Sequence, residues 1–166
     1  WGRSSFKRGA RVHMFENGYV FVYNYEDIGA TQTRGDFSLH LQGDDGVTRA
    51  VPLGDRSNVE LSYWERGFSF DGQGEVVKVQ VSPNGFNWET VAKHRGSSFG
   101  WRQRTVSIPS DQLDEHSEIR FRFDNGGDND HWFVDDITVT SSGSGTTELA
   151  EDWADGNRDG WTATGL

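Results

Sequence analysis

The sequence contains no cysteine, so no disulfide framework can hold this chain together. Long apolar runs are also missing, and no stretch approaches the roughly 20 residues that a membrane-spanning helix needs. Helical periodicity is nearly absent. These absences exclude a disulfide-knotted scaffold and predict no membrane insertion. They do not exclude secretion, because exported domains can be stiffened by calcium instead of disulfides.

Basic residues are scarce, with 16 Lys and Arg against 26 Asp and Glu, which gives a formal net charge of -10. A nucleic-acid partner is disfavoured, because phosphates need cationic counter-charges. The acidic surface suits solubility or cation binding. The one cationic cluster in the sequence runs from Arg3 to Arg11. We interpret it as a solvated turn that balances nearby acids, with attraction to an anionic polysaccharide as the alternative.

Hydrophobic residues make up only 33% of the chain, but aromatic residues account for 13%. Each Trp, Phe or Tyr buries a large area, so 7 Trp and 11 Phe can build a core despite the low aliphatic content. Disorder is disfavoured, since disordered chains have few aromatics. With 21 Gly, the composition favours short strands joined by tight turns, and 166 residues are enough for one domain.

Alternation of apolar and polar residues with a period of two predicts a series of half-buried strands. Such runs occupy residues 19–25, 37–41, 59–64, 75–82, 88–92, 104–108, 118–123 and 132–140. Pro83-Asn-Gly85 is a turn signal that predicts a hairpin between two of them. Residues 111–116 could form one helical turn. The pattern predicts an all-β fold, an antiparallel jelly-roll-type β-sandwich with two sheets.

Residues 141–145 have the composition of a flexible linker. We therefore divide the chain into a sandwich over 1–140, a linker over 141–146 and a segment over 147–166 that looks like the opening of such a module. Either the chain is cut from a tandem array, or it is a circular permutant. In both cases we expect residues 148–161 to pack beside the strand at 132–140, because an unpaired edge is an aggregation liability. A disordered remnant of the next module is the alternative.

Several motifs together carry a family resemblance. They are Leu61-Ser-Tyr-Trp64, Val79-Gln-Val-Ser-Pro-Asn-Gly-Phe-Asn-Trp88, Trp101, Ile119-Arg-Phe-Arg-Phe123, Asp130-His-Trp-Phe-Val-Asp-Asp-Ile-Thr-Val139, Glu151-Asp-Trp-Ala-Asp-Gly156 and Asp159-Gly-Trp161. The chain resembles bacterial and archaeal jelly-roll modules that are similar to MAM-like domains and to accessory domains of immune-inhibitor-A-type metalloproteases and subtilases. The resemblance implies an extracellular or cell-surface module of a larger multidomain protein. Residues 6–57 match only loosely, so it implies no ligand surface there.

Calcium takes six to eight oxygen ligands from carboxylates and carbonyls. The Gly-permissive loop from Asp124 to Asp130 and the following strand offer such groups, and the resemblance implies a structural Ca²⁺ that pins the first and last strands. The predicted ligands are Asp136, Asp124, Asp128, Asp130, Glu151 and Asp152, with Asp27 as a weaker candidate. Regular alternation points Asp135 and Asp136 to opposite faces, so only one of them can serve a site. The alternative is an ordinary polar turn with Asx capping.

Aromatic platforms bind sugars, because the C–H faces of a sugar stack on flat rings. We predict Trp101, Tyr19, Tyr23, Tyr25 and Trp64 as the glycan-binding residues. The three tyrosines share one strand face, which either lines an exposed surface or packs against the second sheet. Trp88 and Trp132 are expected in the core.

No residue carries a convincing catalytic constellation, and we predict that the chain is not an enzyme. The five histidines show no close metal spacing, and no His-Glu-x-x-His motif is present. Gly96-Ser-Ser-Phe-Gly100 spells a nucleophile motif around Ser98, but that motif needs a following helix, which is not indicated. A Gly-Ser loop between strands explains it better.

These observations favour a non-catalytic carbohydrate-binding accessory module, with a polysaccharide or cell-surface glycan as its partner and calcium as its stabiliser. The fold class hosts several unrelated functions, so two other hypotheses stay open. One is a structural or adhesive spacer repeat of a large surface or secreted protein. The other is an accessory domain of a secreted protease.

Overall fold

The computed structural model describes residues 20–24, 37–41, 45–125, 130–142, 146–151 and 160–165. Within these residues the chain forms eleven strands and one short 3₁₀ helix. In chain order they are β1 (Val20–Asn24), β2 (Phe37–Leu41), β3 (Asp45–Ala50), β4 (Glu60–Phe68), β5 (Val76–Ser82), β6 (Glu89–Arg95), β7 (Phe99–Ser107), η3 (Ser110–Gln112), β8 (Glu118–Asp124), β9 (His131–Ser141), β10 (Thr146–Glu151) and β11 (Thr162–Gly165). No helix in this part of the chain is long and apolar enough to cross a membrane.

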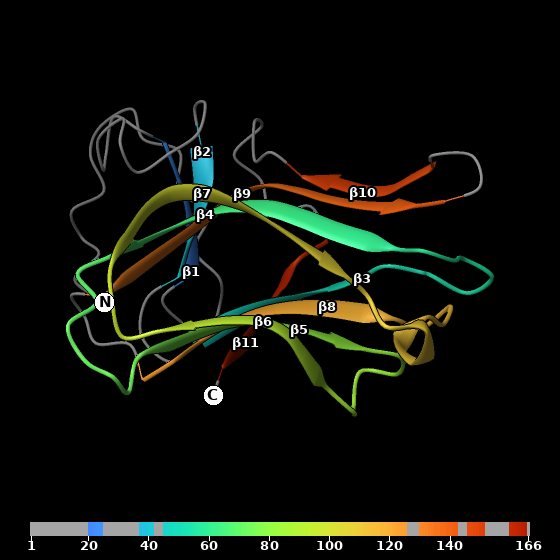
Figure 1. Ribbon diagram of the computed structural model, residues 1–166, viewed down its shortest axis with the longest axis horizontal. Helices are drawn as coiled ribbons and strands as arrows, with labels where there is room; N and C mark the ends of the chain where they lie inside the picture. The colour runs from blue at the N-terminus through green and yellow to red at the C-terminus, as the bar shows by residue number, and fades with distance from the viewer. Residues whose placement is uncertain are drawn as a thin grey trace.

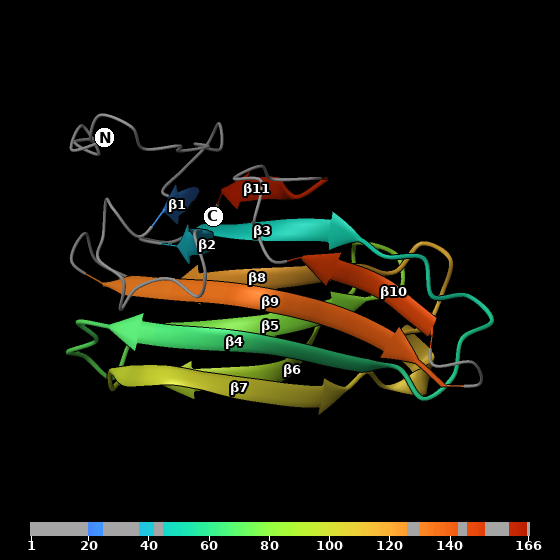
Figure 2. The same cartoon turned by 90° about the horizontal axis from the view of Figure 1, so that it is seen from above.

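The strands form two antiparallel sheets that stack as two layers (Figure 1). Sheet A has the order β1-β2-β9-β4-β7, with β10 also paired to β9. Sheet B has the order β11-β3-β8-β5-β6. Seen from above, β7 and β6 lie along the same side of the sandwich (Figure 2). The prediction of an all-β, antiparallel jelly-roll-type sandwich is confirmed.

The core lies between the sheets, where the alternating apolar faces of the strands meet. In sheet B, Val79 of β5 pairs with Phe121 of β8, and both side chains are buried. In sheet A, the burial of β4 alternates along its length, with Leu61 and Tyr63 turned inward. Trp132 of β9 is fully buried, as the sequence predicted. Removal of this apolar surface from water supplies the main stabilising term.

Strand β9 pairs with three other strands and carries a bulge. Its register against β4 shifts between Ser62 and Trp64, and Asp136 has a left-handed backbone, with φ of 49°. A bulge interrupts the alternation of side chains between the two faces. The expectation that Asp135 and Asp136 point to opposite faces assumed a regular strand, which the chain does not form at this point.

The C-terminal segment joins both sheets. Strand β10 runs antiparallel to β9, with Glu151 opposite Ile137. Strand β11 pairs with β3, and Trp161 just before it is buried in the core. Ser141 ends β9 and Thr146 begins β10, so both ends of the expected linker belong to strands. The permutation and the tandem-array explanations of this segment stay predictions.

Two strands differ from the sequence prediction for one physical reason. Strand β3 was not predicted, because Val47 is its one large apolar inward residue. Strand β7 begins at Phe99, well before the predicted start at residue 104. Its inward positions include Arg102 and Arg104, which pair with a buried carboxylate, so the strand lacks the apolar alternation that would reveal it. The suggested helical turn near residue 111 is the 3₁₀ helix η3.

Candidate functional site

Two of the predicted platform residues lie on the outer face of sheet A. Trp64 of β4 pairs with Gln103 of β7, and both are outward positions, because Glu65 and Arg102 beside them turn inward. The register shifts just beyond this pair, where Gly100 and Trp101 together stand opposite the outward Arg66. This bulge lies between Phe99 and Arg102, which both turn inward, so Trp101 is left on the outward side of β7. Both tryptophans are partly exposed.

Polar side chains surround the two rings on this face. Gln103 donates a hydrogen bond to Ser62 Oγ at 3.1 Å, and Thr105 donates to the same oxygen at 3.3 Å. Arg66, the next outward residue of β4 after Trp64, is partly exposed. The described part of this face therefore combines flat rings with amide, hydroxyl and guanidinium groups. We name Trp64, Trp101, Gln103 and Arg66 the tryptophan face.

The predicted tyrosines contribute less to what the structure describes. Tyr19 and Tyr25 lie outside the described residues. Tyr23 belongs to β1 and pairs with Ser38 of β2 in sheet A, while its side chain is not described. The glycan roles of all three stay predictions.

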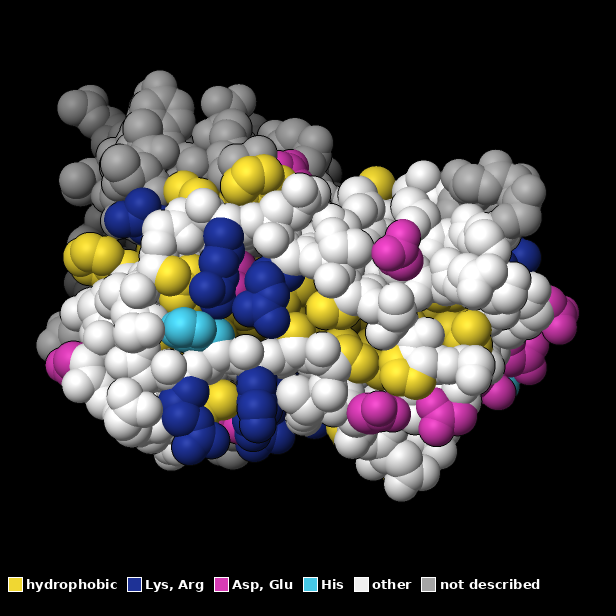
Figure 3. Space-filling view, in the orientation of Figure 1, with side chains coloured by type: hydrophobic (Ala, Val, Ile, Leu, Met, Phe, Trp, Pro, Cys, Tyr) yellow, Lys and Arg dark blue, Asp and Glu magenta, His cyan; other side chains and the backbone are white. Residues whose placement is uncertain are grey.

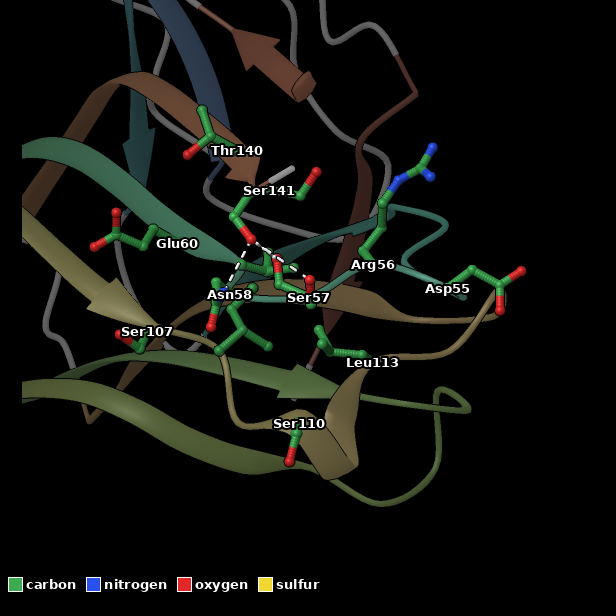
Figure 4. Close-up of a pocket in the computed structure, with 13 residues that line it drawn as sticks. Asp55, Arg56, Ser57, Asn58, Glu60, Ser107, Ser110, Leu113, Thr140 and Ser141 are labelled. Carbon is green, nitrogen blue, oxygen red and sulfur yellow. Dashed lines mark hydrogen bonds between the residues drawn. The ribbon is translucent and has the colours of Figure 1, made fainter. Parts of the chain in front are cut away.

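A cavity of about 720 Å³ opens at the end of the sandwich where β4, β7 and β9 meet (Figure 4). Its walls carry hydroxyl, amide and charged groups, among them Asn58, which donates a hydrogen bond to Ser142 Oγ at 2.9 Å. Arg56 on its rim forms an ion pair with Glu148 at 2.7 Å. The volume suits a small ligand. None of the thirteen described residues that line it is aromatic, so it offers no ring for a sugar to stack on.

Three carboxylates gather at the opposite end, where the β4–β5 loop meets the start of β9. Asp71, Glu75 and Asp130 each place an oxygen within 4.8 Å of the others. Glu75 and Asp130 are buried and Asp71 is exposed. Burial is the main cause that raises the pKa of Glu75, and the nearby Asp71 and Asp130 carboxylates raise it further. This acidic cluster could hold a metal ion.

The structure places the other predicted metal ligands elsewhere or does not describe them. Asp124 forms ion pairs with Lys78, at 2.6 Å, and with Arg122. Glu151 is buried at the end of β10, opposite the residue that follows Asp136. The remaining candidates, Asp128, Asp152 and Asp27, lie outside the described residues. Of the predicted ligands, Asp130 alone belongs to the acidic cluster.

Sequence reasoning missed Asp71, because it lies in a Gly-rich loop that showed no periodic pattern. It missed Glu75 because that residue stands at the start of the predicted strand 75–82. Asp71 donates its backbone N–H to Glu75 Oε2 at 2.9 Å, which ties the loop into a compact turn. Asn125 donates to the carbonyl of Gly74 at 3.0 Å, so the β8–β9 connection is anchored to the same loop. The spacing Asp-x-x-x-Glu was the available signal, but it became meaningful only beside Asp130.

A further polar group with an aromatic ring lies on the outer face of sheet B. The Arg120 guanidinium stacks 4.0 Å above the Trp88 ring and donates two hydrogen bonds to Gln80 Oε1, at 2.9 and 2.7 Å. Gln80 in turn donates to Thr90 at 3.1 Å. Trp88 is partly exposed and is not the core residue that we expected. Phe86, in the preceding turn, is 86% exposed.

Two histidines that are far apart in the sequence meet on sheet A. His40 Nε2 lies 2.8 Å from His131 Nδ1, and both rings stack near Phe133. Burial lowers the pKa of His131. No spacing along the chain predicts this pair, because only strand pairing brings β2 and β9 together.

Ser98 accepts a hydrogen bond from the Phe70 backbone N–H at 3.0 Å, which is a structural role for the apparent nucleophile motif.

No protein-family model matches the chain. No curated protein matches it either. Among solved structures, a family 61 carbohydrate-binding module, TmCBM61 in complex with β-1,4-galactotriose, aligns with a TM-score of 0.53 at 16% identity, over 84% of this chain and 93% of that one. A family 16 carbohydrate-binding module aligns with a TM-score of 0.50 at 17% identity, over 72% and 84%.

The K3 cleaved adhesin domain of Lys-gingipain from Porphyromonas gingivalis aligns less well, with a TM-score of 0.45 at 16% identity, over 64% of this chain and 75% of that one. At such identities the likeness establishes the fold alone. The chain is thus a β-sandwich of the kind found in carbohydrate-binding modules. The finer resemblance to MAM-like and protease-associated modules stays a prediction.

Proposed function

We propose that this protein is a non-catalytic carbohydrate-binding accessory module of a secreted or cell-surface protein, and that it acts as a monomeric unit within a larger chain. The observation that carries the proposal is the tryptophan face. Trp64 and Trp101 stand on adjacent strands, on one outward face, and neither is buried. Each indole keeps part of its surface exposed on this face, and a sugar ring stacked there would remove that apolar surface from water.

The chemistry of the face fits a chain of sugar rings. Each indole offers a flat apolar surface to sugar C–H groups, while its N–H and the neighbouring Gln103 and Arg66 can bind hydroxyl groups. A pair of rings on neighbouring strands would contact adjoining sugars of an extended glycan. The strands hold both rings rigidly, which lowers the entropy lost on binding.

We further propose that the acidic cluster holds a structural Ca²⁺. Three carboxylates are hard oxygen ligands that suit this ion. The three carboxylates place oxygens within 4.8 Å of one another, so a divalent cation would offset their mutual repulsion. Bound there, it would join the β4–β5 loop to the start of β9 and stiffen that end of the sandwich.

The experiment is glycan titration followed by tryptophan fluorescence and calorimetry, with β-1,4-galactan as the first probe and xylan as the second. We expect Trp64→Ala and Trp101→Ala each to weaken binding by roughly 30-fold, since an interface anchor contributes about 2 kcal/mol. Trp88→Ala is the matched control, because it removes a partly exposed indole from the opposite sheet and should leave the affinity within twofold.

Three outcomes would count against the proposal. Absence of binding to any neutral or acidic polysaccharide would overturn the function and favour a spacer repeat. Loss of binding in Trp88→Ala, with Trp64→Ala unchanged, would move the site to sheet B. If Trp101→Ala lowered the free energy of unfolding by as much as it lowered the free energy of binding, that ring would be assigned to packing.

A further inference from the structure

We infer that the open edge of the sandwich formed by β6 and β7 binds the negative charges of an anionic polysaccharide, one whose sugars carry carboxylate or sulfate groups. The inference rests on the proposed glycan-binding function and adds the charge class of the glycan. We name the four cations of this edge, Lys93, Arg95, Arg102 and Arg104, the basic edge.

The basic edge begins as a feature of the sequence. Residues 90–110 contain all four of its cations and no acidic residue, in a chain with 26 Asp and Glu. The segment is also the link between the sheets, because β6 ends sheet B and β7 ends sheet A. The fold therefore concentrates this cationic segment along one side of an otherwise acidic molecule.

The two edge strands lie above one another on the side that faces the reader in Figure 1, as the view from above shows (Figure 2). On that side, dark-blue cationic side chains form one group above and one below a cyan histidine (Figure 3). Hydrophobic side chains show between the two groups (Figure 3). The upper group belongs to the layer of sheet A and the lower group to the layer of sheet B.

The cations outnumber the carboxylates that neutralise them. Arg102 and Arg104 share one partner, the buried Glu65, whose Oε2 lies 2.7 Å from Arg102 Nη2 and 3.6 Å from Arg104 Nη1. Among the described residues, Lys93 and Arg95 form no ion pair, and both are exposed. The edge therefore keeps a surplus of positive charge that reaches solvent.

An aromatic ring fixes part of this edge in place. The Arg102 guanidinium lies 3.8 Å from the centroid of the Phe99 ring, and His94 packs edge-on against the same ring at 4.5 Å. Val91 and Val106 pack against the core as partly buried residues of the two strands. Arg102 already donates its Nε to Glu65 Oε2 at 2.8 Å, so a carboxylate or sulfate would bind the other side of this guanidinium, where Nη1 and the second Nη2 hydrogen point. The apolar side chains between the cations would contact the sugar rings.

Net charge decides between polysaccharide and nucleic acid as the partner. A duplex carries one phosphate charge per about 1.7 Å of its axis, and a protein of charge -10 repels so dense a polyanion. A polysaccharide that carries one or two charges on each sugar has a lower charge density than the duplex. Screening over about 8 Å at physiological salt limits the repulsion from acids on the other faces. The basic edge therefore fits the anionic glycan better.

The test compares charged polymers with their neutral counterparts at 50 and 200 mM NaCl. The probes are polygalacturonate against its methyl ester, dextran sulfate against dextran, and duplex DNA. We expect binding to one or both of the anionic glycans, weakened at least fivefold by the higher salt, and little binding to the neutral counterparts. The first pair tests carboxylates and the second tests sulfates.

The variants remove exposed charges and leave Glu65 and its partners untouched. We expect Lys93→Gln with Arg95→Gln to weaken anionic binding about tenfold, because each exposed charge contact contributes modestly. The double variant Lys93→Arg with Arg95→Lys keeps the charge and should keep the affinity. Arg56→Gln removes one cation far from this edge and should change the affinity less than twofold.

Each remaining outcome would overturn the inference. These are equal binding of a charged polymer and its neutral counterpart, duplex DNA bound as tightly as the anionic glycans, or no effect of the Lys93 and Arg95 variants. Aggregation of those variants with unchanged affinity would assign the cations to protection of the edge strands. Neutral galactan bound through Trp64 without tighter binding of any anionic glycan would leave the proposed function standing and sink this inference alone.

Discussion

Two buried carboxylates, Glu65 and Glu75, stand in opposite electrostatic surroundings. Glu65 is 2% exposed, and its partners are built into the fold: two arginines of β7 and the Trp132 indole, whose N–H donates to Oε1 at 3.2 Å. Glu75 is 6% exposed and faces two further carboxylates, Asp71 and Asp130. Gathering negative charges in a buried place is costly, so a proton or a metal ion would stabilise the carboxylates around Glu75, whereas two arginines already stabilise Glu65.

The comparison teaches that burial alone does not mark a functional carboxylate. Glu65 is more deeply buried than Glu75, yet both of its carboxylate oxygens have hydrogen-bond or ion-pair partners. It therefore serves the packing of the edge strand β7. The pKa of Glu75 is raised mainly by its burial, which means that the folded chain disfavours its charged form. A group that the fold leaves short of counter-charge is the better place to look for a ligand.

The largest effect should follow from removing the carboxylate that has complete partners. We expect Glu65→Ala to lower the free energy of unfolding by about 3 kcal/mol, because it leaves a buried indole N–H without its acceptor and two arginines without their counter-charge. Urea unfolding measures this. Glu60→Ala, an exposed position on the same strand, should stay within about 0.5 kcal/mol. Equal costs for the two variants would show that the Glu65 group is not structural.

The next effect should come from adding a divalent cation that binds the acidic cluster. We expect excess Ca²⁺ to raise the melting temperature relative to EDTA, corresponding to about 2.7 kcal/mol when Ca²⁺ is at 100 times its dissociation constant. Asp130→Asn should abolish the response. Asp114→Asn, which removes a carboxylate outside the cluster, should preserve it. The cluster would be excluded as the site if the Asp130 variant responded as the natural chain does.

The smallest effect concerns Asp124, a carboxylate with partners at the surface. Burial acts to raise its pKa, but hydrogen bonds and charge from Lys78 and Arg122 outweigh that, so its pKa is lowered. We expect Asp124→Asn to cost about 1 kcal/mol at neutral pH. A lowered folded pKa gives stability that is present above the unfolded value of about 3.9 and is lost as the pH falls through the folded value.

The stability difference between the natural chain and Asp124→Asn should therefore shrink on the acid side of about pH 4. Unfolding at several pH values measures it, with the exposed Asp111→Asn as the control. A difference that stays constant, or grows toward acid, would show that the ion pairs with Lys78 and Arg122 do not lower the pKa of Asp124.

The strands were predictable wherever a core position is apolar. Phe37–Leu41 and Glu118–Asp124 match or nearly match the predicted ranges, because their inward residues alternate cleanly. Apolar–polar alternation does not reveal β3 or the first half of β7, where inward positions are small or cationic. Alternation detects apolar burial and is blind to a buried ion pair such as Glu65 with Arg102.

The candidate sites were less predictable, because each is made by pairing between distant strands. Residue type alone marks Trp64 and Trp101 as possible sugar platforms, and only the register of β4 against β7 puts them on one face. Asp130 was chosen from its loop, whereas Asp71 and Glu75 come from a connection far earlier in the chain. The basic edge differs, because its four cations lie in one contiguous segment, residues 90–110, whereas the sequence prediction placed the one cationic cluster at Arg3 to Arg11.

Along one of its edges, strand β9 pairs with two separate strands. These are β2, at Leu39–Leu41, and β10, at Thr146–Glu151. The second pairing closes a short local hairpin, whereas the first closes a loop that contains most of the chain. Loop closure costs more entropy as the loop lengthens, and long-range pairing slows folding. An insertion anywhere between residues 42 and 130 would therefore raise the entropy cost of pairing β2 with β9 and leave that of the β10 hairpin unchanged. The late segment of the chain is kinetically the easier half of that edge to assemble.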